Sequence, residues 1–289
     1  MKKLLISSLF WLSPTVVLAD PLQVLASFSI VGNLVQEIGG ERVNVTTLVG
    51  ADQDAHVYQP APQDVKKLNR ASVFVVNGLG FEGWVSRLAK SSGFKGKTVI
   101  ASAGIAPQNN PAGQGEHGHS GQDPHAWHNP QNVKVYVRNI AAALTQADPS
   151  GKDYYAQRLT RYAQQLDEAD TFARAQFERI PRARRQVVTS HEAFAYLAQH
   201  YQIRFIAPQG ISTDAEASAK GVAQLVRQVR HEKIKAVFVE NMTDSRLVAQ
   251  LSREAGVTVG GKLYADALYS GHYIPGFGRT YYLTASVKF

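Results

Sequence analysis

The feature that most restricts the fold of this chain of 289 residues is a long helical stretch near its middle. Between residues 150 and 180, apolar side chains recur every three or four positions, and neither glycine nor proline occurs from residue 152 onward. This spacing predicts one amphipathic helix of roughly 45 Å, since an α-helix rises about 1.5 Å per residue. The stripe lacks a heptad repeat, which disfavours a coiled-coil arm. A helix of this length can run along two separate lobes.

Strands and helices alternate on both sides of this helix. Short apolar runs typical of buried parallel strands precede amphipathic segments. We expect strands at residues 23–28, 43–49, 73–77, 98–101, 186–189, 204–207, 236–240 and 258–260, and helices at 30–38, 60–71, 81–90, 132–144, 193–201, 217–231 and 245–255. The chain is therefore predicted to be an α/β protein with two α/β lobes joined by one long rigid backbone helix. The expected units are an N-terminal metal-binding lobe (20–148), the linking helix (149–180) and a C-terminal lobe (181–268).

The first residues have the pattern of a secretory signal peptide. Two lysines precede an apolar run over residues 4–12, and Val17 and Ala19 stand at positions −3 and −1 of a cleavage site. The run is too short for a membrane span, and no later run of 18 apolar residues occurs. We therefore expect residues 1–19 to be removed and the mature protein to reach the periplasm; an uncleaved anchor helix is the alternative.

The charge of the chain gives no sign of a nucleic-acid partner. There are 31 Lys and Arg against 23 Asp and Glu, a formal net charge of +8, and removing two leader lysines leaves 29 − 23 = +6. This excess is spread along the chain without long basic runs, whereas nucleic-acid binding needs a concentrated basic surface. We expect a monomer that binds no nucleic acid.

The absence of cysteine narrows the possible chemistry. With no Cys and nine His, disulfide frameworks, Cys-ligated zinc, iron–sulfur clusters and thiol catalysis are excluded. A transition-metal site here would use imidazole and carboxylate ligands.

Two motifs that point to enzymes are incomplete. GLGFEG (residues 78–83) has the spacing of a dinucleotide-binding turn, but the next predicted strand ends without the acid that such a site needs. We interpret it as a tight strand-to-helix turn. His191 and Glu192 begin a HExxH zinc-protease motif, but Ala195 stands where its second histidine would be.

Three histidines and one aspartate follow predicted strands or precede a predicted helix. These residues are His56, His125, His191 and Asp266. Because open α/β sheets place ligand sites at the carboxyl ends of their strands, all four could converge on one cleft between the lobes. Three imidazoles and a carboxylate suit Zn²⁺ or Mn²⁺, and the number of nitrogens favours Zn²⁺.

Three other histidines lie in loops and are not expected to be principal metal ligands. His128 lies three residues after His125, and we interpret it as a packing residue of the loop. His117 and His119 lie in a Gly- and Pro-rich loop over residues 109–123, where they could form a weak metal-collecting arm or have no metal role.

At these residues the sequence resembles the zinc- and manganese-type solute-binding proteins of bacterial ABC importers. The resemblance covers residues 22–268 and is carried by the motifs GADQDAHVYQPAPQDVKKL, VVNGLGFEGW, DPHAWHNPQNVKVYVRNIAAAL, VVTSHEAFAYLA, APQGIST, VFVENMTD and GGKLYADAL. It implies two lobes linked by a rigid helix, with one metal ion held between them. The implied partner is an inner-membrane ABC permease.

The resemblance also implies the ligand set. Carried over by motif, the ligands are His56, His125, His191 and Asp266, and the family pattern selects His125 rather than His128. A site closed by four protein ligands suits binding more than catalysis, so we expect no enzymatic activity. His191 stands where some manganese-binding relatives carry Glu, which favours zinc.

The end of the chain departs from the family pattern. Residues 269–289 read YSGHYIPGFGRTYYLTASVKF, and apolar and polar side chains alternate from Tyr281 to the terminal Phe289. This tail resembles the last strand of a TonB-dependent outer-membrane receptor, which indicates a gene fusion or a frameshift. A harmless edge strand of the second lobe is the alternative. Asp266 lies close to this junction and is therefore the least secure of the four expected ligands.

Alternative functions remain open at this point. A manganese- or iron-binding receptor of the same family would use the same residues. A metallohydrolase would need an open coordination position and a general base, for which Glu192 and Glu240 are the candidates. An exported adhesin is a third possibility, which an exposed aromatic tail could favour.

Overall fold

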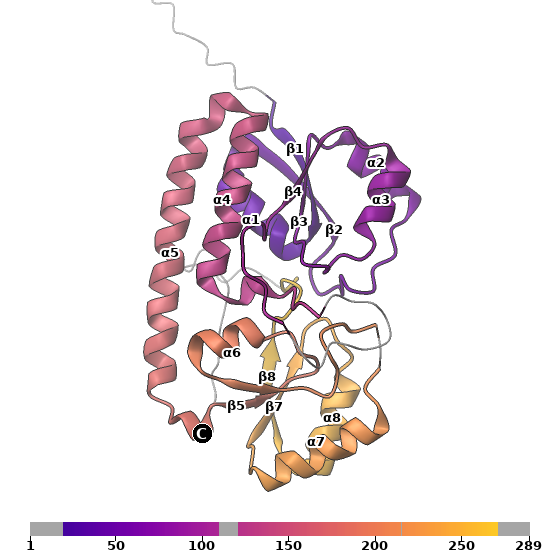
Figure 1. Ribbon diagram of the computed structural model, residues 1–289, viewed down its shortest axis with the longest axis vertical. Coiled ribbons are helices and arrows are strands. Elements are labelled where there is room, and N and C mark those ends of the chain that lie inside the picture. The colour runs from indigo at the N-terminus through magenta and orange to yellow at the C-terminus, as the bar shows by residue number, and fades with distance from the viewer. Residues whose placement is uncertain (1–19, 110–120, 215, 271–289) are drawn as a thin grey trace, which may run out of the picture.

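The computed structural model describes residues 20–109, 121–214 and 216–270, which form two lobes, each built on a parallel sheet (Figure 1). The predicted leader, the histidines at 117 and 119 and the tail from residue 271 lie outside the described residues. No helix in the described part of the chain is long and apolar enough to cross a bilayer.

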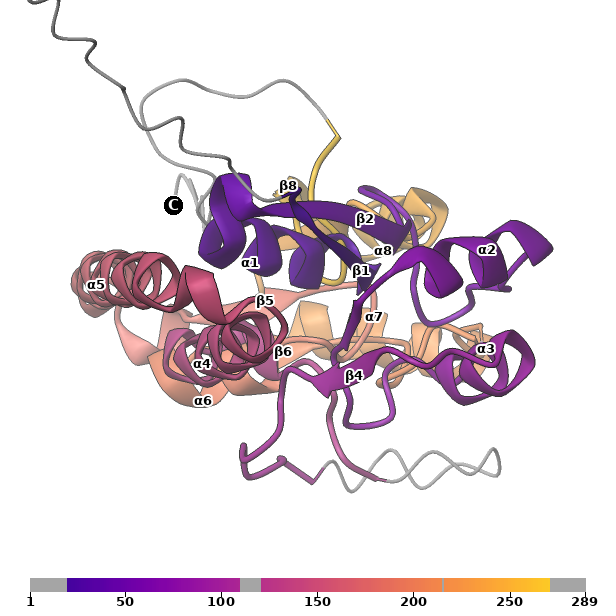
Figure 2. The same cartoon turned by 90° about the horizontal axis from the view of Figure 1, so that it is seen from above.

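The first lobe contains four parallel strands in the order β2-β1-β3-β4. Its elements are β1 (Leu22–Phe28), α1 (Ser29–Gly39), β2 (Val43–Val49), α2 (Pro62–Arg70), β3 (Val73–Val76), α3 (Val85–Ser92), β4 (Lys97–Ile100) and α4 (Pro130–Ala147). All four residues of the inner strand β3 are buried, as its continuous apolar run predicts. Seen from above, the sheet lies between α1 and α4 on one side and α2 and α3 on the other (Figure 2).

The second lobe repeats this plan with the order β6-β5-β7-β8. Its elements are β5 (Gln186–Val188), α6 (Ala195–Tyr201), β6 (Arg204–Ile206), α7 (Ala219–His231), β7 (Ala236–Glu240), α8 (Ser245–Ala255) and β8 (Thr258–Leu263). Single-turn 3-10 helices lie at Gly40–Arg42, Ala126–His128, Pro149–Gly151 and Arg182–Arg184. In both sheets every strand pair is parallel, so each sheet gathers its carboxyl ends along one edge.

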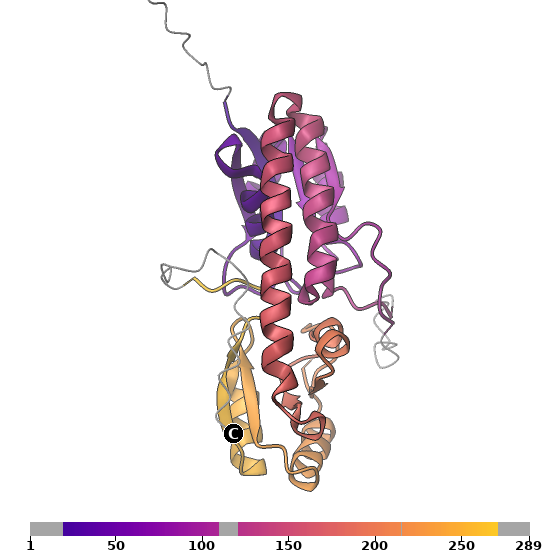
Figure 3. The same ribbon diagram turned by 90° about the vertical axis from the view of Figure 1, so that its left-hand side faces the viewer.

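The predicted long helix is α5 (Lys152–Glu178), with 27 residues. It runs beside α4 on the first lobe and continues along the second (Figure 3). Leu166 belongs to the core of the first lobe, whereas Phe177 packs in the second, with its ring centroid 5.1 Å from that of Tyr201. Between them, buried Asp170 accepts a hydrogen bond from the Tyr201 hydroxyl (3.0 Å) and lies 2.7 Å from Nε2 of His200. One helix therefore supports both cores.

The GLGFEG segment forms the tight turn expected from the sequence, but the helix after it begins at Val85 rather than at residue 81. Gly78 has φ +89°, and a Cβ there would lie 2.5 Å from Cγ2 of Ile100. The buried Glu82 carboxylate accepts hydrogen bonds from the backbone N–H groups of Asn77 (2.6 Å) and Gly78 (3.1 Å). The side chain of Glu82 therefore holds the turn, and the helix starts later.

A carboxylate at the junction of α4 and α5 fastens this helix pair to the 3-10 turn that precedes β2. Asp148 accepts hydrogen bonds from Arg42 Nε (2.8 Å), the Tyr155 hydroxyl (2.7 Å) and the Ser150 hydroxyl (2.6 Å). Burial acts to raise the pKa of Asp148, but these hydrogen bonds outweigh it and lower the pKa to about 2. Because this value lies below the unfolded value of about 3.9, the carboxylate stabilises the folded state above about pH 4. The stabilisation is lost as the pH falls toward 2.

We expect Asp148→Asn to lower the free energy of unfolding by about 1–2 kcal/mol at pH 7, and by progressively less as the pH approaches 2. Thermal unfolding between pH 7 and pH 2.5 measures this difference. Asp244→Asn is the matched control, since Asp244 pairs with Arg246 on an exposed surface and should contribute little. A difference between wild type and Asp148→Asn that does not change with pH would contradict the account.

Candidate metal centre

The four residues singled out from the sequence meet where the two lobes face each other. His56 lies in the loop between β2 and α2, and His125 immediately precedes the 3-10 turn that leads into α4. His191 follows β5, and Asp266 follows β8. Three of the four are therefore placed by strands that end at the facing edges of the sheets, as the strand-end argument predicts.

The four side chains form one compact cluster. One ligand atom from each lies within 4.8 Å of the others. Nε2 of His56 is 3.2 Å from Nε2 of His125 and 3.2 Å from Oδ2 of Asp266, and Nε2 of His191 is 3.0 Å from the same oxygen. Nε2 of His125 is 3.5 Å from Oδ1 of Asp266. Three imidazole nitrogens thus surround one carboxylate.

The cluster is buried and its polar atoms are poorly satisfied. His125, His191 and Asp266 are fully buried, yet both oxygens of Asp266 and Nε2 of His191 lack a hydrogen bond of good geometry. A buried polar atom without a partner costs about 1–3 kcal/mol, so three of them in one place are unfavourable by themselves. A cation between these atoms would satisfy all of them, and the donor set therefore fits a divalent metal ion.

The ionisable groups of the cluster change one another's pKa. Burial alone would raise the pKa of Asp266, but attraction to His191 and His125 outweighs burial and holds that pKa well below its ordinary value. Burial lowers the pKa of His56, which keeps its ring neutral and able to bind metal. Burial acts the same way on His191, but the charges of Glu240 and Asp266 raise its pKa well above the ordinary value. A metal ion bound to this ring would therefore have to displace a proton from His191.

Two further carboxylates orient the rings from behind. Oε2 of Glu240 lies 2.5 Å from Nδ1 of His191, and Oδ1 of Asp123 lies 2.7 Å from Nδ1 of His125. Each carboxylate can only accept here, so Nδ1 carries the hydrogen and Nε2 is directed at the cluster. The role of Asp123 was not predicted from the sequence, and Glu240 was considered only as a general base. The only sequence signal was that Asp123 lies two residues before His125 and that Glu240 ends a strand.

Aromatic side chains close the side of the cluster that belongs to the first lobe. The Phe81 ring lies edge-on to His56, with centroids 4.6 Å apart, and Trp127 lies 5.2 Å from His125. The indole N–H of Trp127 donates to the carbonyl of Ala265 (3.0 Å), the residue before Asp266. Trp127 therefore both excludes water from the cluster and ties the segment of Asp266 to the first lobe.

His128 takes no part in the cluster. Its ring packs against Phe194, with centroids 4.7 Å apart, and burial lowers the pKa of His128 to about 3. His125 thus lies in the cluster, whereas His128 packs outside it.

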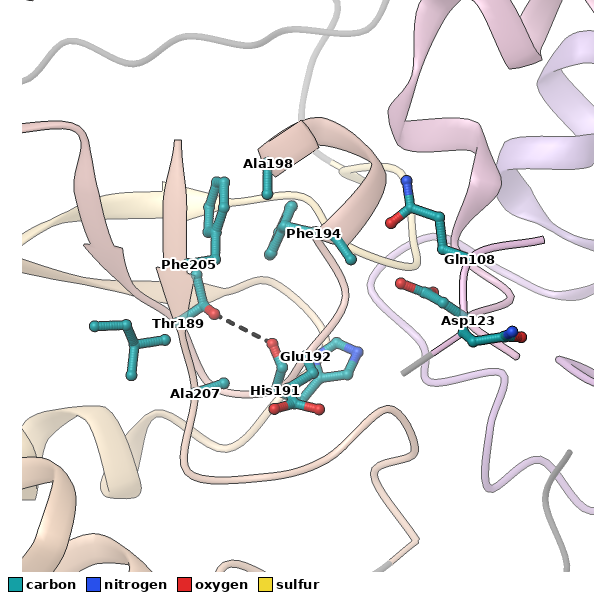
Figure 4. A pocket seen from close by; sticks show the side chains of 12 residues that line it. Gln108, Asp123, Thr189, His191, Glu192, Phe194, Ala198, Phe205 and Ala207 are labelled. Atoms are coloured by element: carbon teal, nitrogen blue, oxygen red, sulfur yellow. Dashed lines mark hydrogen bonds between the residues drawn. The ribbon is translucent and has the colours of Figure 1, made fainter. Parts of the chain in front are cut away.

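A cavity of about 240 Å³ borders the cluster and is lined by residues of both lobes. Figure 4 shows Phe194 and Phe205 on one side of it, Gln108 and Asp123 on the other, and His191 with Glu192 at one end. Glu192 therefore lines the space beside His191 and is not one of the four clustered residues.

Glu240, one of the two candidates for a hydrolytic base, is engaged by the residues around His191. Oε1 of Glu240 accepts hydrogen bonds from the backbone N–H groups of Ser190 (2.8 Å) and His191 (3.1 Å), while Oε2 holds the His191 ring. Both oxygens of Glu240 are thus occupied with positioning. Four converging side chains that could all bind one ion suit the closed coordination of a binding site.

The chain matches a known protein family over most of its length. The family model described as zinc-uptake complex component A, periplasmic, matches residues 24–282. This match continues beyond residue 268, where the resemblance was expected to stop, and so includes part of the tail.

Named relatives include manganese-binding proteins. The chain is 29% identical to a manganese ABC transporter substrate-binding lipoprotein, PsaA, of Streptococcus pneumoniae, over 86% of this chain and 82% of that protein. It is 31% identical to the manganese-binding lipoprotein MntA of Halalkalibacterium halodurans, over 86% and 81%.

Solved structures with the same fold include both zinc- and manganese-binding proteins. The periplasmic zinc-binding protein TroA of Treponema pallidum superposes with a TM-score of 0.79 at 27% identity, covering 86% of this chain and 90% of that one. A manganese-bound periplasmic metal-binding protein from Candidatus Liberibacter asiaticus gives a TM-score of 0.75 at 30% identity, covering 86% and 91%.

The family match spans most of the chain, and the two-lobed fold and the four-residue cluster agree with it. The chain therefore belongs to the family of metal-binding solute receptors of ABC importers, which are binding proteins and not enzymes.

Proposed function

We propose that this protein captures Zn²⁺ in the periplasm and delivers it to an inner-membrane ABC permease. The observation that carries the proposal is the convergence of His56, His125, His191 and Asp266 on one buried point, with unsatisfied atoms directed at it. The ion is the cargo of this site. Its positive charge compensates the Asp266 carboxylate, and its coordination replaces the missing hydrogen bonds.

The choice of zinc rests on the donor atoms. Three imidazole nitrogens and one carboxylate match the tetrahedral nitrogen-rich coordination that Zn²⁺ prefers, whereas Mn²⁺ favours more oxygen ligands. Relatives are named for both metals, so a manganese- or iron-binding receptor with the same four residues is the alternative within the family.

The organisation of the chain follows from the same proposal. Residues 20–148 and 181–268 would act as two lobes around the ion, joined by residues 149–180. Cleavage of the leader (residues 1–19) would release a monomer into the periplasm, and the charge pattern supports no nucleic-acid partner. Nothing in the described cluster favours the adhesin or the hydrolase over cargo binding.

We expect wild-type protein to bind one Zn²⁺ per chain in isothermal titration calorimetry, with higher affinity than for Mn²⁺. Loss of a group that hydrogen-bonds to a metal ligand typically costs about 10- to 100-fold in affinity. His56→Ala and His191→Ala should each cost more than this, because they remove a ligand atom. His128→Ala is the control and should retain most of the affinity. Equal losses in all three variants would refute the ligand assignment, and the absence of saturable binding of Zn²⁺ would refute the proposed cargo.

The orienting carboxylates generate a second prediction. Glu240→Gln and Asp123→Asn keep the size of the side chain but weaken its hold on the Nδ1–H group of His191 or His125, so zinc affinity should fall about 10- to 100-fold. Competition with a chromophoric chelator measures the change.

Asp170→Asn serves as the matched control for these two variants. Asp170 is also a buried carboxylate beside a histidine, His200, but it lies on α5 and outside the cluster. We expect it to change stability and to leave zinc affinity close to that of the wild type. An equal loss of affinity in all three variants would show that the effect is not specific to the metal centre.

A further inference from the structure

The loop that carries His56 is fastened to the opposite lobe by two aspartates. Asp52 accepts hydrogen bonds from the side-chain amide of Asn241 (2.8 Å) and from the backbone N–H of Ser270 (2.9 Å). Asp54 accepts a hydrogen bond from the hydroxyl of Thr213 (2.6 Å). Asn241 and Thr213 both follow strands of the second sheet, so these contacts cross the boundary between the lobes.

Asp54 has a second contact that reaches the metal centre. Its Oδ1 accepts the backbone N–H of His56 (2.9 Å), while its Oδ2 accepts the hydroxyl of Thr213. One carboxylate therefore fixes the backbone of a ligand residue in the first lobe and, at the same time, binds the second lobe.

The partner of Asp54 is connected to the other side of the centre. The segment before Thr213 lies beside that of His191, because the backbone N–H of Glu192 donates to the carbonyl of Gly210 (3.1 Å) and His191 pairs with Gln209 in a parallel bridge. The Asp54–Thr213 hydrogen bond thus joins the two loops that hold His56 and His191, one from each lobe.

We propose that the Asp54–Thr213 hydrogen bond is an interlobe clasp that sets the rate at which the bound ion leaves. Asp54 acts as a positioning residue, since it touches the ion only through His56. The inference rests on the proposed function, namely that the four clustered residues hold the cargo.

The physical reason is that the ligands are divided between the lobes. His56 and His125 belong to the first lobe, while His191 and Asp266 follow strands of the second, so the ion cannot leave until the two sets separate. Separation must break the hydrogen bond between Thr213 and a carboxylate, which is stronger than one between neutral groups. The bond is also expected in metal-free protein, because neither partner is one of the four clustered residues, so its loss should not slow the capture of the ion.

The test compares Thr213→Val, which keeps the shape of the side chain but has no hydroxyl, with Thr213→Ser, which keeps the hydroxyl. Zinc dissociation is followed by stopped flow with excess chelator, and association in a separate mixing experiment. Thr213→Val should release zinc about tenfold faster, equivalent to about 1.4 kcal/mol, and its association rate should be no lower than that of the wild type. Thr213→Ser should release zinc at the rate of the wild type.

Ser212→Ala is the matched control because Ser212 lies on the same loop, and its hydroxyl accepts from the backbone of Asp214 within that loop. It should leave both rates unchanged. A wild-type dissociation rate in Thr213→Val, or the same acceleration in Ser212→Ala, would overturn the clasp.

A second measurement separates this inference from the choice of cargo. In metal-free protein, amide hydrogen exchange of residues 52–56 should be faster in Thr213→Val than in wild type, because the His56 amide loses the anchoring of its acceptor. If wild type bound no zinc, the proposed function would fail. The exchange rates of residues 52–56 would still show whether the Asp54–Thr213 hydrogen bond holds the loop of His56. Unchanged exchange in Thr213→Val would overturn the interlobe clasp.

Discussion

The buried carboxylate of Asp266 is the interaction on which the rest of this structure depends. A carboxylate withdrawn from water is strongly unfavourable unless opposite charge or hydrogen-bond donors surround it. Here three imidazole rings surround it, and neither oxygen has a hydrogen bond of good geometry. The attraction of the histidines keeps the pKa of Asp266 low, so the group stays ionised in a dry site. Such a site is prepared for a small divalent cation.

The fold brings the four clustered residues together and supports both lobes on one helix. Parallel sheets in both lobes direct their carboxyl ends toward a common boundary, which brings the four clustered residues together from distant parts of the sequence. The helix α5 packs against the core of the first lobe through Leu166 and against that of the second through Phe177, so one helix supports both lobes. Glu240 and Asp123 then fix the rotation of two rings. Coordination is thereby organised before the ion arrives.

Much of this fold could be predicted because local signals were strong. The strand β2, the strand β7 and the helix α8 have the same bounds as those expected from the sequence, since each is an apolar or amphipathic run between clear breaks. The helix α3 starts later than expected because Glu82 is used to hold the preceding turn. The strand β8 continues past Gly260 because β7 offers it a pairing partner as far as Leu263, which no local pattern reveals. The four clustered residues could be named because strand ends carry ligands, but the roles of Asp123 and of the Asp54–Thr213 contact depend on how the lobes meet.

The most direct measurement of the central claim is a crystal structure of the zinc-loaded protein with anomalous diffraction data collected at the zinc absorption edge. The account predicts one strong peak between the lobes, bonded to Nε2 of His56, His125 and His191 and to a carboxylate oxygen of Asp266, at the distances of about 2.0–2.2 Å that zinc makes with nitrogen and oxygen. A peak on other histidines such as His128 or His200, or no peak between the lobes, would contradict it.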